Sequence, residues 1–103
     1  MGKTVDICGI PHKIVEKEYI EGDGRVLGEI EYSSCTISLR KDQTPEMYQQ
    51  TLIHEVVHGM LFQIGRGDLS NDETFVQSLA MAINLTFRLR DEEHDNLKGG
   101  VEE

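Results

Sequence analysis

The chain has few cysteines, no long apolar run and no surplus of basic residues, and each shortage argues against a class of protein. Its 103 residues include only two cysteines, Cys8 and Cys35. Two cysteines do not form the disulfide framework by which small secreted domains compensate for a small core. We therefore expect both thiols to be reduced and buried. The length suffices for one domain with a single modest core.

Membrane and targeting signals are also missing from the sequence. No apolar run approaches the roughly 20 residues that a membrane-spanning helix needs. Residues 1–6 contain no apolar signal region, and position 6, where N-myristoylation requires serine or threonine, is Asp6. We therefore expect a cytoplasmic protein that does not bind membranes.

Negative charge dominates the chain, whose formal net charge at pH 7 is −9. Much of this charge lies in the last thirteen residues, which contain six acids and one lysine. Excess negative charge repels the phosphate backbone of nucleic acids, and no local basic patch is visible, so we expect no direct nucleic-acid partner. We interpret residues 1–90 as one domain and residues 91–103, with the solvated His94, as an acidic and flexible tail.

Two strands are predicted between Lys3 and Tyr19. The β-branched residues of this stretch favour strand structure, and Gly9-Ile10-Pro11 interrupts them with residues typical of turns. His12 follows directly after this turn. We interpret it as an exposed histidine at the start of a strand rather than as a ligand.

Two further strands are predicted after the polar loop Glu21–Arg25. Apolar residues within Val26–Tyr32 indicate the first of them. In the second, Cys35, Ile37 and Leu39 alternate with polar residues and therefore share one face. Together the four segments predict a small antiparallel sheet of three to four strands, arranged as a meander.

The first helix is predicted to begin after Thr44. Threonine is a favourable N-cap, Pro45 fits the first helical position, and an acid follows in the positively polarised first turn. The helical pattern continues to Phe62 or Ile64, after which Gly65 supplies a C-terminal stop.

A second helix is predicted to start within residues 70–73 and to end near Leu89 or Arg90. Apolar residues recur in it at helical spacing. They are Val76, Leu79, Ala80, Ile83 and Phe87. The expected fold is therefore α+β, with the small antiparallel sheet packed on two main helices.

The first predicted helix contains the motif His-Glu-x-x-His, formed by His54, Glu55 and His58. A helix advances about 100° per residue, so the two histidines lie one turn apart on one face and can present two imidazole nitrogens to one zinc ion. Glu55 stands beside the pair, within reach of a zinc-bound water, and is a candidate general base. This chemistry hydrolyses peptide bonds. The alternative interpretation is a pair of surface histidines on an amphipathic helix.

A catalytic zinc site generally has a third protein ligand, and two acids at the start of the second helix are candidates. Glu73 and Asp72 both border its apolar face, and we choose Glu73 for its longer reach. Glu73 also has a structural interpretation, because Ser70-x-x-Glu73 matches a capping box. One turn beyond Glu73, Gln77 is placed to orient an imidazole through its side-chain oxygen, although a polar residue at a helix border is an equally good interpretation.

These residues give the chain a resemblance to a known family. It resembles the gluzincin branch of the zincin metallopeptidases, and is most similar to small phage and mobile-element-associated zincin-like proteins related to the ImmA/IrrE metallopeptidases. The resemblance spans about residues 30–87. It rests on Ile37-Ser38-Leu39, on the motif stretch Thr51–Gly59, on Gly65, and on Asp72-Glu73 followed by Val76 and Leu79-Ala80.

The resemblance implies a minimal zincin-like fold with zinc at His54, His58 and Glu73 and with Glu55 as the catalytic residue. It also implies that the strand Cys35–Leu39 forms the edge of a cleft along which an extended peptide binds. The chain departs from thermolysin-like members at Gln77, where they carry an acid.

An oxyanion stabiliser is not assigned from the sequence. Tyr32 and Tyr48 are near the motif along the chain, and each is interpreted as a packing residue.

Two further hypotheses remain beside the metallopeptidase. In one, the chain is a zinc-stabilised regulatory or protein-binding module with no or vestigial protease activity. In the other, it is a metal-free helical adaptor. The partner expected for the enzyme is a protein or peptide substrate, for example a regulator encoded near it.

Overall fold

The computed structural model of the chain describes residues 2–21 and 25–87. The predicted acidic tail, residues 91–103 with His94, lies outside the described residues.

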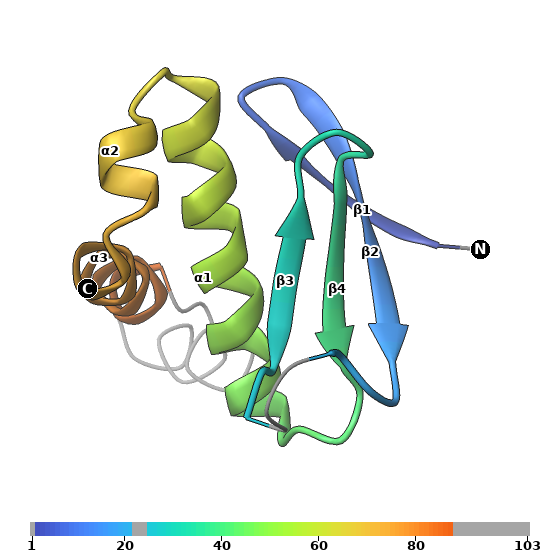
Figure 1. Cartoon of the computed structure of the whole chain (residues 1–103). Helices are drawn as coiled ribbons and strands as arrows, with labels where there is room; N and C mark the ends of the chain where they lie inside the picture. The colour runs from blue at the N-terminus through green and yellow to red at the C-terminus, as the bar shows by residue number, and fades with distance from the viewer. Residues whose placement is uncertain (1, 22–24, 88–103) are drawn as a thin grey trace, which may run out of the picture.

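A four-stranded sheet forms one layer of the molecule (Figure 1). Its strands are β1 (Lys3–Ile7), β2 (Ile10–Lys17), β3 (Gly28–Glu31) and β4 (Thr36–Arg40), in the spatial order β1-β2-β4-β3. The predicted α+β class is confirmed. The predicted all-antiparallel meander is wrong, because β4 returns between β2 and β3 and pairs with β2 in parallel. The loop after β2 is long enough to carry the chain past one strand position, whereas the short turn after β3 keeps β3 and β4 adjacent and antiparallel.

His12 lies inside the protein, so its predicted exposure is wrong. The side chain is fully buried, and its Nδ1 lies 2.8 Å from the carbonyl oxygen of Ile10. Successive residues of a strand face opposite sides of the sheet, so His12 shares its face with Ile14. Because Ile14 packs into the core between the sheet and the helix formed by residues 45–63, His12 faces the core as well.

Both cysteines are free thiols, as expected, but their predicted burial is wrong. Cys8 is exposed and Cys35 is partly exposed. Each occupies a turn between two strands with a positive φ, 52° for Cys8 and 51° for Cys35, a conformation that is uncommon outside glycine. The two turns lie at the same end of the sheet (Figure 1), away from the middle of its apolar face.

The helices are α1 (Pro45–Gln63), α2 (Gly67–Ser70) and α3 (Glu73–Thr86). Thr44 caps α1 as predicted, and its hydroxyl accepts a hydrogen bond from the backbone N–H of Met47 at 3.2 Å. Gly65, with a φ of +82°, follows α1 and turns the chain. The sequence does not predict the short α2, and α3 ends earlier than the predicted Leu89 or Arg90. In the part of the chain that the structure describes, no helix is long and apolar enough to cross a membrane.

Helix α1 is the middle layer of the molecule (Figure 1). The sheet packs on one side of it and α3 on the other, and within the described residues α3 contacts α1 and α2 but no strand. Buried apolar residues accordingly form two clusters. One contains Ile7, Ile37 and Leu39, and the other contains Val57, Leu61, Val76 and Ala80.

Helix α1 comes close to the sheet at Gly59. A Cβ atom at this position would lie 2.9 Å from Cδ1 of Ile7 and 3.1 Å from Cδ1 of Ile30. Both distances are shorter than ordinary van der Waals contact, so a larger residue would require the ends of the Ile7 and Ile30 side chains to move. This close approach is next to His58 and holds the histidine-bearing part of α1 against β3.

Candidate metal centre

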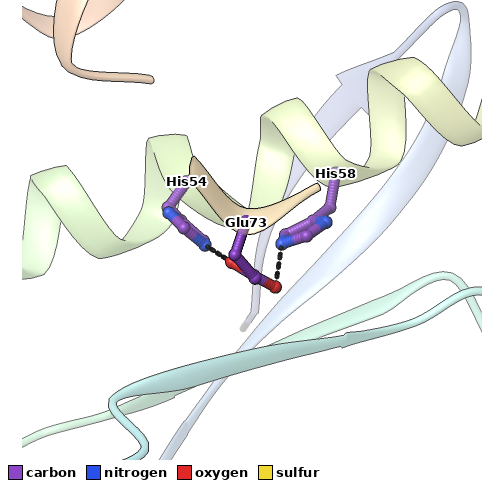
Figure 2. A group of neighbouring side chains, drawn as sticks. All are labelled: His54, His58 and Glu73. Carbon is purple, nitrogen blue, oxygen red and sulfur yellow. Dashed lines mark hydrogen bonds and ion pairs between the residues drawn. The ribbon is translucent and has the colours of Figure 1, made fainter. Parts of the chain in front are cut away.

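Two histidines of α1 and the first residue of α3 point toward one another (Figure 2). His54 Nε2 lies 3.1 Å from one carboxylate oxygen of Glu73, and His58 Nε2 lies 3.2 Å from the other. One potential ligand atom from each residue falls within 4.8 Å of the other two. The structure thus brings together the three residues that the sequence predicts as ligands. They form a group that could hold a metal ion.

Asp72, the rival of Glu73 as third ligand, has a different role. Its side chain caps α3 by accepting a hydrogen bond from the backbone N–H of Phe75 at 3.1 Å. The alternative of a capping box between Ser70 and Glu73 is therefore wrong, because α3 starts after Asp72 and not after Ser70. With Asp72 as the cap, the carboxylate of Glu73 is free to face the histidines.

Each imidazole also has a polar partner at its other ring nitrogen. His54 Nδ1 lies 2.7 Å from Oε1 of Gln77, so the contact considered for Gln77 in the sequence is present. His58 Nδ1 lies 3.4 Å from Oγ of Ser70, a longer contact that the sequence did not indicate. An amide oxygen only accepts hydrogen bonds, so His54 donates from Nδ1 to Gln77 and its Nε2 is directed at the carboxylate of Glu73.

Glu55, the predicted general base, is buried beside this group. Its side chain is only 7% exposed. Burial raises the pKa of its carboxyl group from 4.5 to about 7; His54 opposes this shift, whereas the negative charges of Glu73 and Glu29 reinforce it. A carboxyl group with a pKa near neutrality can both accept and release a proton at physiological pH.

Two open cavities meet at Gly28 and Glu55. One, of about 310 Å³, is also lined by His58 and Glu73. The other, of about 200 Å³, is also lined by His54. The candidate ligands therefore line two neighbouring cavities, and Glu55 lines both of them.

The strand beside these cavities is β3, which forms an edge of the sheet. The expectation that Cys35–Leu39 forms the cleft edge is wrong. Residues 36–39 belong to β4, which is paired with β2 on one side and with β3 on the other. Within the described part of the chain, β3 pairs only with β4, so its outer edge is available for pairing.

The two tyrosines that stand near the motif in the sequence lie in different surroundings. Tyr48 packs in the sheet-side cluster, and its hydroxyl donates to a carboxylate oxygen of Glu16 at 2.8 Å. Tyr32 lines the larger cavity, and its hydroxyl lies 3.1 Å from Oγ of Ser70. The sequence missed this contact because it joins residues that are distant along the chain.

Comparison with protein-family models, with curated proteins and with solved structures found no match. What the chain does is therefore inferred from the side chains around His54, His58 and Glu73.

Proposed function

We propose that the chain is a minimal zinc-dependent metallopeptidase of the zincin type, in which His54, His58 and Glu73 bind the ion and Glu55 is the general base. The observation that supports this best is the convergence of two imidazole Nε2 atoms and one carboxylate, while both Nδ1 atoms have partners on the outside. Two histidines and one glutamate, with a further position open to water or substrate, are one of the ligand sets of catalytic zinc.

The orientation of the His54 imidazole suits a cation at the centre of this group. His54 donates from Nδ1 to Gln77, and its Nε2 lies 3.1 Å from a carboxylate oxygen of Glu73. A metal ion here would replace the proton between these two atoms, because a deprotonated imidazole nitrogen and a carboxylate oxygen are both zinc ligands.

Zinc held by these residues would polarise the carbonyl group of a peptide and make a water molecule easier to deprotonate. Glu55 accepts a proton from the attacking water as the new C–O bond forms at the carbonyl carbon. It then donates this proton to the amine nitrogen as the C–N bond breaks. A carboxyl group whose pKa is raised by burial to about 7 suits both proton transfers.

The proposed substrate is a protein or peptide in the cytoplasm, bound in extended form along β3. An open strand edge can pair its backbone with an added strand. β3 is such an edge, and its Gly28 lines both cavities that meet at Glu55. By analogy with the small phage and mobile-element-associated zincin-like proteins, one candidate substrate is a regulator whose gene lies near the gene for this protein.

The substitution Glu55→Gln tests the proposed reaction. We expect the wild-type protein and E55Q to bind about one zinc ion per chain, because Glu55 is not a ligand. Only the wild type should cleave a mixture of unfolded peptides, as followed by mass spectrometry, and a chelator should stop the cleavage. The matched control is Glu46→Gln, an exposed acid on the same helix, which should cleave like the wild type. Zinc-loaded wild type and E55Q that cleave at the same rate would contradict the proposal.

A zinc-stabilised regulatory or protein-binding module is the second candidate. The amide of Gln77 as the partner of His54 favours it, because an amide oxygen supports the basicity of the imidazole less than a carboxylate does. If wild type and E55Q both hold zinc and neither cleaves any peptide, the module is supported. A zinc content below about a tenth of an equivalent, in protein purified without an affinity tag, would contradict both zinc hypotheses and favour the metal-free adaptor.

A further inference from the structure

The hydroxyl of Ser70 is the meeting point of polar groups from two other parts of the chain. Ser70 is the last residue of α2 and is 4% exposed. Its Oγ lies 3.2 Å from the carbonyl oxygen of His58, 3.4 Å from Nδ1 of the same histidine, and 3.1 Å from the hydroxyl of Tyr32. Ser70 thus connects the turn after β3 with the histidine-bearing face of α1.

The valences of this hydroxyl determine the direction of each contact. A serine hydroxyl has one proton to donate and two lone pairs that accept. The carbonyl oxygen of His58 can only accept, so the Ser70 proton is directed to it. The other two groups then act as donors, Tyr32 through its phenolic O–H and His58 through Nδ1–H. All three sites of the hydroxyl are then occupied, and Nε2 of His58 is directed at Glu73.

Tyr32 is held in place independently of this contact. Its ring stacks on that of Phe62, with the ring centroids 4.0 Å apart and the ring planes 6° from parallel. The stack fixes the phenol on the wall of the larger cavity with its hydroxyl against Ser70. Because the Tyr32 hydroxyl donates its proton to Ser70, only its lone pairs remain for other contacts, and these can accept hydrogen bonds.

We propose that Ser70 and Tyr32 are positioning residues of the metal centre. Ser70 holds the imidazole of His58 in the Nδ1-protonated form with Nε2 directed inward, and Tyr32 holds Ser70. The inference rests on the proposed function insofar as it takes His58 to be a metal ligand.

Zinc affinity tests the role of Ser70. Competition with a chromophoric chelator measures zinc binding by the wild type, by Ser70→Ala and by the control Ser78→Ala, which removes an exposed hydroxyl from α3. Loss of a partner that orients a metal-ligating histidine typically weakens binding about 10- to 100-fold, and we expect this loss for S70A and none for S78A. Circular dichroism verifies that both variants are folded. Folded S70A that binds zinc as tightly as S78A would overturn the proposal.

A double-mutant cycle tests whether Tyr32 acts through Ser70. Tyr32→Phe removes the hydroxyl and keeps the ring that stacks on Phe62. We expect Y32F to weaken zinc binding less than S70A does, because His58 keeps its own contact with Ser70. The double variant Y32F/S70A should bind like S70A alone, since the two side chains act in series. Losses that add in the double variant would show that Tyr32 acts independently of Ser70.

The protonated nitrogen of His58 can be measured without zinc or substrate. Long-range ¹⁵N–¹H spectra of the metal-free protein at alkaline pH distinguish an imidazole protonated at Nδ1 from one protonated at Nε2. We expect the Nδ1 form in the wild type and in S78A, and a substantial Nε2 form in S70A. An unchanged His58 spectrum in S70A would overturn the positioning role, whereas a failure of the wild type to bind zinc would overturn the proposed function.

Discussion

Replacement of Glu55 by glutamine should make the metal-free protein more stable than the wild type at alkaline pH. In the folded chain, burial raises the pKa of Glu55 to about 7 from an ordinary value of 4.5. A carboxyl group whose pKa is higher in the folded state contributes stability in its protonated form. That contribution is fully present below pH 4.5 and is lost as the pH rises toward 7. Glutamine, which has a similar shape and no charge, does not show this loss.

The size of the effect follows from the two pKa values. Each pH unit between them changes the relative stability by about 1.4 kcal/mol. Between pH 5.5 and pH 8, the free energy of unfolding of the wild type should therefore fall by about 2 kcal/mol relative to that of E55Q. The lower pH is chosen to stay above the isoelectric point of about 4.8, where the protein is least soluble.

Urea unfolding followed by circular dichroism in the presence of a chelator provides the measurement. The difference in unfolding free energy between wild type and E55Q removes the contribution of titrating groups that do not interact with Glu55. The control is again E46Q, whose exposed side chain should give no pH-dependent difference of this size. A difference between wild type and E55Q that is the same at both pH values would refute the reasoning about the burial of Glu55.

Three further predictions concern the metal centre and the helices around it. Zinc at about 100 times its dissociation constant should raise the unfolding free energy of the wild type by about 2.7 kcal/mol, as measured by urea titration, and His54→Ala should abolish most of this gain. Gly59→Ala should cost about 1 kcal/mol in the same assay, because crowding of the Ile7 and Ile30 side chains outweighs the gain of about 1 kcal/mol in helix propensity. Gly67→Ala, which meets no atom within 4 Å, should not show this loss. Asp72→Ala should lower the free energy of unfolding by about 1 kcal/mol, because α3 loses its cap, and should keep zinc binding. Glu73→Ala should lose zinc binding in the chelator competition. Equal zinc affinities of the two variants would contradict the assignment of Glu73 as the third ligand.

The sequence predicts those features of the site that depend on local geometry. His54 and His58 share a face because they are four residues apart in a helix, and the cap at Thr44 and the stop at Gly65 follow from residue type. The choice between Asp72 and Glu73 could not be made in this way. Both acids border the apolar face, and only the position at which α3 begins determines which one becomes the cap.

Other features of the structure depend on contacts that local patterns do not contain. The parallel pairing of β2 with β4 joins segments separated by a whole strand, and the contact of Ser70 with Tyr32 spans the entire helix α1. The burial of His12, in contrast, could have been predicted from the local sequence pattern. It stands two residues before Ile14, and the alternation of a strand places both on the core side.

The layered arrangement of the molecule has a consequence for how the centre can open. Glu73 belongs to α3, which within the described residues contacts the helices and none of the strands. This helix packs on α1 through one apolar cluster and through hydrogen bonds that join Asn84 to Gln49 and Gln50. Separation of α3 from α1 would take Glu73 away from the histidines and leave the packing of the sheet on α1 unchanged. We therefore expect the metal centre to open in a local event with a lower free energy than global unfolding. An ion bound by residues of both helices would stabilise the contact between α3 and α1. Of these two helices, only α1 also packs on the sheet.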